Sequence, residues 1–268
     1  MDNKYPAHIC IRQAFCAVAY TFLTIFFTCS CLFSSAQSNR EPTPEERAAI
    51  DRTVHAVLPV MQQFMDENWT TIKGGTDSPD DYSVGTKPQV PLNTEPFNTW
   101  QFSVKENSPL WNEKLHPLFE KLMHPPADYN DSTQMKVWHR LSREYHNLKD
   151  IFVEVEVNRP GLLVNPDKNS KENLKIPGCA FAAKLQHDHW MGTDRSLEAG
   201  YVLAFGNWST AKFRQGYNDY RFHFVHPNNS PFIENIVIII MGNEQRIKEL
   251  LSKINWNDVN NGLSLYPC

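Results

Sequence analysis

Cysteine is scarce in most of this chain, and the familiar sequence motifs of catalysis are missing. Four of the six cysteines fall within the first 36 residues. The sequence has no G-x-S-x-G nucleophile elbow, no H-E-x-x-H zinc helix, no phosphate-binding glycine loop, no EF-hand loop and no C-x-x-C pair. These absences exclude the sequence-visible forms of hydrolase, metalloprotease, nucleotide enzyme and thiol oxidoreductase, but not a site assembled from distant residues.

Positive charge is also in short supply. The chain has 26 basic and 30 acidic residues, which gives a net charge of −4, and no stripe of basic residues is evident along the sequence. This balance argues against nucleic acid as a partner. Residues 37–268 are numerous enough for one large domain or two small ones with a sizeable core.

The first 36 residues have the composition of an export signal. A basic start precedes a charge-free run from Gln13 to Phe33, and Ser34 and Ala36 occupy the small-residue positions expected before a cleavage site. We therefore predict that residues 1–36 are a signal that is removed, so that the mature protein begins at Gln37.

Two other interpretations of this segment stay open. The charge-free run approaches the ~20 residues that span a bilayer, so the segment could remain as a membrane anchor. Cys31 suggests a lipoprotein, although the residues before it do not suit lipidation. Every version locates residues 37–268 outside the cytosol, in a periplasmic or extracellular space, and after cleavage we expect no membrane partner.

The two remaining cysteines, Cys179 and Cys268, predict one disulfide, because exported proteins work in an oxidising compartment. Such a bond would tie the C-terminal residues to the domain across a long loop. On the chain-entropy model it would contribute about 4 to 5 kcal/mol. The alternative is a pair of unpaired thiols.

The hydrophobic periodicity predicts an α+β fold. A capping box at Thr43 and Glu46 starts a first helix, which Pro59 should kink, and a long Pro- and Asp-rich loop covers residues 73–96. Further segments are predicted at residues 99–105 (strand), 108–122 and 132–148 (helices), 151–157, 180–185, 201–205, 220–225 and 236–241 (strands), and after Asn243 (helix).

The order of these segments favours a mainly antiparallel sheet packed by helices, with an N-terminal helix and a C-terminal helix. We expect residues 37–97 to hold the N-terminal helix and the long loop, and residues 98–268 to form the α+β domain. The two parts should make one globular unit. The unbroken apolar run at residues 236–241 predicts a central strand covered on both faces.

Histidines supply one candidate site. His187 and His189 would point to the same side of an extended segment, where they could ligate a metal with Asp194 as a third ligand. The alternative is a solvated polar turn. His223 and His226 lie on a predicted strand and face opposite sides, so at most one of them could join this site.

Aromatic and basic residues supply a second candidate. Trp69, Trp190 and Trp208 fall in predicted loops or strand ends, and Arg214 and Tyr217 follow Trp208 closely. Together, Trp190, Trp208, Arg214 and Tyr217 could form the mouth of a binding site for an anionic or glycan ligand. The alternative is that these aromatics pack against the ends of a sheet.

A third pattern is the carboxylate pair Glu154 and Glu156, two residues apart on one predicted strand. Such a spacing is compatible with paired-carboxylate chemistry, but a solvated strand face looks the same.

The sequence thus predicts an exported binding or interaction module without covalent chemistry or a cofactor. Its ligand would be a small molecule, a glycan or a protein. One alternative is a metal-dependent enzyme that uses Zn²⁺ at His187 and His189. A structural, envelope-associated protein is another.

Overall fold

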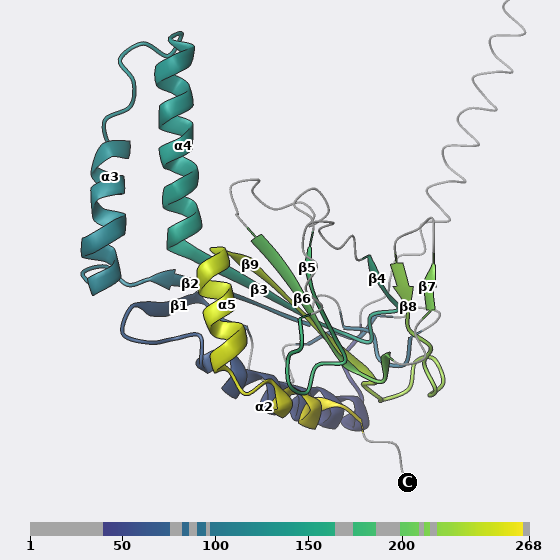
Figure 1. Ribbon diagram of the computed structural model, residues 1–268. Coiled ribbons are helices and arrows are strands. Elements are labelled where there is room, and N and C mark those ends of the chain that lie inside the picture. The colour runs from purple at the N-terminus through teal and green to yellow at the C-terminus, as the bar shows by residue number, and fades with distance from the viewer. Residues whose placement is uncertain are drawn as a thin grey trace, which may run out of the picture. The chain divides into compact units, whose positions relative to one another are not determined.

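The computed structural model describes the chain from residue 40 to residue 264, with internal gaps (Figure 1). The described ranges are 40–75, 82–85, 90–94, 97–163, 174–185, 199–208, 212–214 and 219–264. Within them the protein has an α+β fold, as the sequence predicts.

A six-stranded sheet forms the centre of the fold, with every neighbouring pair of strands antiparallel. The strand order across this sheet is β1-β2-β3-β9-β6-β5. Its strands are β1 (Trp69–Lys73), β2 (Asn98–Val104), β3 (Asp150–Val157), β5 (Phe181–Leu185), β6 (Ala199–Gly206) and β9 (Asn235–Gly242). The predicted central strand is confirmed, because β9 lies between β3 and β6.

A smaller, three-stranded sheet has the order β4-β8-β7. Its strands are β4 (Gly161–Leu163), β8 (Asp219–Arg221) and β7 (Lys212–Arg214). The predicted strand at residues 220–225 is therefore too long, since β8 ends at Arg221.

Helices follow the predicted caps closely. Thr43 and Glu46 form the capping box of α2 (Pro44–Gln62), which continues as a helix beyond Pro59. The Asn243 side chain caps α5 (Glu244–Lys253), and a short 3₁₀ helix, η5 (Trp256–Gly262), comes after it.

Another helical pair connects β2 to β3. A π-helical turn, η2 (Trp111–Leu115), leads into α3 (His116–Leu122). The Asp131 side chain then caps α4 (Ser132–Lys149), which runs directly into β3. Figure 1 shows α3 and α4 side by side beyond the end of the large sheet.

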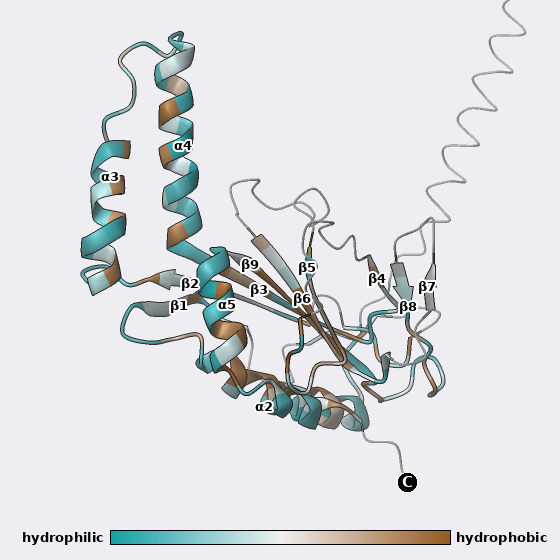
Figure 2. Ribbon diagram, viewed as in Figure 1, coloured by the Kyte–Doolittle hydropathy of each residue, from teal (hydrophilic) through white to brown (hydrophobic). Residues whose placement is uncertain are grey.

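The large sheet buries a different cluster on each face because its residues alternate in direction. On β9, Ile236, Ile238 and Ile240 pack with α2, α5 and η5 in the main core, whereas Val237 packs in a second cluster with the small sheet. Figure 2 shows the strongly apolar character of β9. The space between the two sheets is therefore lined by apolar side chains.

Trp69 belongs to the main core, which corrects its prediction as a loop residue. Its indole is 3 % exposed, and the guanidinium of Arg246 lies 5.2 Å from the ring centroid. Arg246 also donates to the Phe64 carbonyl at 3.0 Å and to the Asp66 carboxylate at 2.8 Å. Arg246 therefore joins α5 to the segment between α2 and β1.

An ion-pair cluster fixes the start of α5 to the sheet. The Lys184 ammonium lies 2.8 Å and the Lys248 ammonium 2.9 Å from the Glu244 carboxylate, and the Tyr201 hydroxyl donates to it at 3.3 Å. The hydrogen bond from Lys184 is the main cause that lowers the pKa of Glu244 to about 2. Because the ionised form is favoured in the folded state, this stabilisation is complete above the ordinary pKa of 4.5 and is lost as the pH falls toward 2.

We therefore predict that Glu244→Gln lowers the free energy of unfolding by about 1 to 2 kcal/mol at pH 7 and by much less near pH 2.5. This range allows for solvent screening, since the Glu244 side chain is 26 % exposed. Urea unfolding at the two pH values measures the difference. Glu249→Gln on the same helix, whose ion pair with Arg246 is longer at 3.4 Å, should cost less than about 0.5 kcal/mol at pH 7. An equal loss at both pH values for Glu244→Gln would contradict the prediction.

Candidate functional site

An apolar pocket of about 260 Å³ lies where the two sheets meet. Five of its lining residues are apolar or aromatic, and the other two, Gly206 and Asn207, lie at the end of β6. The lining residues are Leu162, Ala180, Phe181, Gly206, Asn207, Trp208 and Tyr220.

Backbone geometry at the end of β6 brings Trp208 into this pocket. Gly206 has φ of +101°, a conformation that side-chain-bearing residues rarely adopt, and a Cβ there would collide with the Glu234 carbonyl oxygen. The chain therefore turns immediately after β6, and the Trp208 indole packs edge-on against the Phe222 ring at 4.8 Å between centroids.

Trp208 is a wall of the pocket and not an exposed stacking platform. Its side chain is buried, and its indole N–H donates to the Phe205 carbonyl at 3.0 Å. A ligand in the pocket would thus meet the carbon surface of this ring, because the polar atom of the indole already has a partner.

Phe181 and Tyr220 form another wall. Their ring centroids lie 5.3 Å apart with the planes tilted by 47°, and both rings are only partly buried. None of the described residues that line the pocket carries a formal charge. The pocket therefore suits an uncharged and largely apolar group better than an anion.

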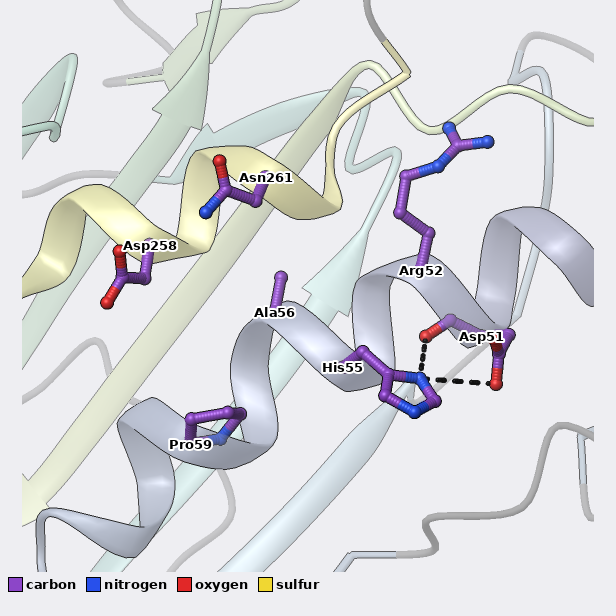
Figure 3. A pocket seen from close by; sticks show the side chains of 7 residues that line it. All are labelled: Asp51, Arg52, His55, Ala56, Pro59, Asp258 and Asn261. Carbon is purple, nitrogen blue, oxygen red and sulfur yellow. Dashed lines mark hydrogen bonds and ion pairs between the residues drawn. The ribbon is translucent and has the colours of Figure 1, made fainter.

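A second, polar groove of about 550 Å³ lies between α2 and η5 (Figure 3). His55 Nδ1 is 2.9 Å from the Asp51 carbonyl oxygen and 3.2 Å from its carboxylate, a pairing that would suit a general base. The His55 side chain is, however, 74 % exposed, and Figure 3 shows Arg52 extending away from the pair. The Asp258 carboxylate accepts instead from the Asn255 amide at 3.1 Å. The groove does not gather its polar groups around one point.

Glu234 and His226 form a deeply buried titratable pair. The exposed fraction of the side chain is 0 % for Glu234 and 14 % for His226. The Glu234 carboxylate accepts from the backbone N–H groups of Val225 at 2.9 Å and His226 at 2.7 Å, and lies 3.0 Å from His226 Nδ1. The His226 ring stacks on Phe232 at 3.7 Å between centroids. These bonds fix the segment after β8 to the start of β9, so the pair has a structural role. Glu234 gives no signal in the sequence, because its partners Val225 and His226 lie outside its own strand.

The predicted site residues meet different outcomes. Trp208 is found in the apolar pocket. Arg214 belongs to β7, but its side chain lies outside the described set. The remaining predicted ligand and metal residues also lie outside the described residues, namely His187, His189, Trp190, Asp194 and Tyr217. Their roles stay predictions.

The two carboxylates of β3, Glu154 and Glu156, have different neighbours. Glu156 forms an ion pair with Arg159 at 2.6 Å, whereas Glu154 lies opposite Thr99 on β2 and Ile239 on β9 in the strand register. The register supplies no second carboxylate opposite Glu154. This observation favours the interpretation of the pair as part of a polar strand face.

Cys179 lies beside the apolar pocket at the start of β5. Its Sγ lies 2.7 Å from the Phe181 carbonyl oxygen and 3.3 Å from that of Ala204, and burial raises the pKa of the thiol to about 11. A free thiol here would stay protonated at neutral pH and would be a poor nucleophile. Cys268 lies outside the described residues, so the disulfide stays a prediction.

The described residues show neither a metal-ligand cluster nor a membrane-spanning helix. Within the described ranges, no three His, Cys, Asp or Glu side chains come together as potential metal ligands. None of the helices there combines the length and apolar character needed to cross a membrane. Comparison with protein-family models, with curated proteins and with solved structures found no match to this chain.

Proposed function

We propose that this protein is a binding module that takes up a small, uncharged and largely apolar group in the pocket between its two sheets. The observation that carries the proposal is the convergence of Leu162, Phe181, Trp208 and Tyr220 around one cavity. Pockets that bind small molecules are typically lined by aromatic and aliphatic side chains with a few polar groups at defined positions. Asn207 and the nearby backbone would supply those polar groups.

The chemistry of the lining favours an aromatic or aliphatic ring over a sugar or an anion. A sugar would require several hydrogen bonds, but the Trp208 N–H is already bonded to Phe205. An anion would require a positive charge, and the lining residues that the structure describes supply none. The proposed ligand therefore differs from the anionic or glycan ligand that the sequence suggests.

The size of the pocket limits the affinity. Its volume of about 260 Å³ is slightly below the ~300 Å³ at the lower end of common ligand sites, so it fits a single ring or one side chain of a larger partner. A ligand of that size makes few contacts to offset the translational and rotational entropy that it loses on binding. We therefore expect a Kd of about 0.1 to 1 mM for an isolated ring.

Export is part of the proposal, supported by the composition of residues 1–36. In that setting the protein would bind its ligand in the periplasm or outside the cell. The raised pKa of the Cys179 thiol supports binding without covalent chemistry at this residue.

We predict that p-cresol binds to the purified mature protein and that Ala180→Leu weakens this binding at least tenfold. Ala180 lines the pocket and its side chain is exposed, so a leucine there would fill the entrance without disturbing the core. Ligand-observed NMR and calorimetry would measure the affinity. Methyl α-D-glucopyranoside should show no saturable binding.

Ala48→Leu is the matched control, because Ala48 is exposed on α2 and does not line the pocket. It should leave the p-cresol affinity unchanged within a factor of two. Failure of p-cresol to bind the unmodified protein, or equal binding by the Ala180→Leu variant, would overturn the proposed site.

A further inference from the structure

The helix α4 presents a row of positively charged residues along one side. Lys136, Arg140 and Arg143 are spaced by four and three residues, which places them on the same face of a helix. His139 and His146 border this row, and all five side chains are exposed. We refer to these five residues as the basic face of α4.

The opposite side of α4 packs against the rest of the protein. Tyr145 is buried there and its ring lies 6.0 Å from the ring of Phe119 on α3. Leu141 and Leu148 are packed against the main core. Since this apolar side faces inward, the basic face is directed away from α3 and the sheet. Figure 2 shows hydrophilic residues over much of α3 and α4.

The three cations of this face form no ion pair within the described parts of the protein, although the exposed Glu144 follows Arg140 by one helical turn. None of the ion pairs found there involves Lys136, Arg140 or Arg143. The chain as a whole is acidic, with a net charge of −4, so this local excess of positive charge runs against the average composition. The sequence concealed it, because the three cations are separated by other residues and come together only through the turn of the helix.

We infer that the basic face of α4 binds a linear, acidic polysaccharide. The three cations follow the helix axis over seven residues, or roughly 10 Å at 1.5 Å per residue, so they form a line and not a broad patch. Regularly spaced anionic groups along a chain complement such a line. Basic patches bind heparin or nucleic acid, and the net charge of −4 disfavours nucleic acid. This inference goes beyond the pocket proposed above and does not depend on it.

The charges near the α3–α4 turn argue against a bilayer as the partner. Met123 and Tyr129 are exposed in this turn, as a membrane-inserting tip would require. Asp128 and Asp131 lie beside them, however, and would be repelled by an anionic lipid surface. A polysaccharide along the side of α4 would avoid both carboxylates.

Heparin, used as a sulfated polysaccharide probe, tests the inference directly. The variant Lys136→Gln, Arg140→Gln, Arg143→Gln should bind heparin at least tenfold more weakly than the unmodified protein in 50 mM salt. The dependence of log affinity on log salt should also become shallower by about 2, because fewer counterions are released. Calorimetry of the full mature chain at several salt concentrations would supply both quantities.

The matched control removes the same charge from three exposed lysines outside α4, with Lys73→Gln, Lys175→Gln and Lys253→Gln. It should retain heparin binding within a factor of three. Equal losses in both triple variants, or no heparin binding by the unmodified protein, would overturn the inference. Tighter binding to anionic phosphatidylserine vesicles or to single-stranded DNA than to heparin would also overturn it, in favour of a membrane or a nucleic acid partner. Circular dichroism checks that each variant stays folded.

Discussion

Replacing Glu234 with alanine should lower the free energy of unfolding by about 3 kcal/mol or more. The carboxylate is buried and accepts hydrogen bonds from the backbone N–H groups of Val225 and His226, as well as pairing with the His226 ring. Alanine would leave these donors without the buried carboxylate that accepts from them, and each buried unsatisfied group costs about 1 to 3 kcal/mol. Urea unfolding followed by circular dichroism measures the loss.

Two further variants define the origin of this loss. Glu234→Gln keeps one acceptor oxygen, so it should cost less than the alanine variant, about 1 to 2 kcal/mol. Glu67→Ala removes an exposed carboxylate and should change the stability by less than about 0.5 kcal/mol. A loss below about 1 kcal/mol for Glu234→Ala would mean that water takes over the role of the carboxylate.

The contacts of Glu234 also explain why the predicted strand at residues 220–225 is wrong beyond Arg221. The alternation Tyr220, Phe222, Phe224 predicts a strand through Val225, yet β8 ends at Arg221. Beyond that point the backbone N–H groups of Val225 and His226 donate to the Glu234 side chain and not to a neighbouring strand. Alternation of apolar residues reports burial, but it cannot show which acceptor a backbone donor will find.

Elements whose signals are local were predicted well. The capping box of α2 and the Asn243 cap of α5 depend on residues within one turn of the helix, so both appear in the sequence. The apolar run of β9 likewise identified a central strand. By contrast, β1 is a short strand at the sheet edge, where Thr70, Thr71 and Lys73 carry no apolar pattern.

The candidate pocket could be predicted only in part from the sequence. The sequence points to Trp208 because it is an aromatic residue near a predicted strand end and is closely followed by Arg214 and Tyr217. Phe181 and Leu162 gave no such signal, since each looks like an ordinary strand residue. The pocket exists because β4 and β8 pair with each other and lie against β5 and β6, which is a matter of sheet topology.

Trp256→Ala should be the most damaging core substitution on the helical side of the large sheet. The indole is fully buried between Phe64, whose ring it meets edge-on at 6.3 Å, and Phe205, on which it stacks at 6.5 Å. Its N–H donates to the Leu251 carbonyl at 3.3 Å, so it links the end of α5 to the core. Truncation of a buried tryptophan leaves a large cavity and typically costs about 3 to 5 kcal/mol.

A conservative variant separates the loss of volume from the loss of the hydrogen bond. Trp256→Phe fills most of the space but cannot donate to Leu251, so we expect a loss of about 1 to 2 kcal/mol. Tyr129→Ala removes an aromatic side chain that is 67 % exposed and should stay within about 0.5 kcal/mol of the unmodified protein. Denaturant unfolding would rank the three variants. Equal stability of Trp256→Ala and Tyr129→Ala would contradict this packing. If the junction of α2, α5 and β6 holds the helices to the sheet, removal of the Trp256 side chain must lower the free energy of unfolding.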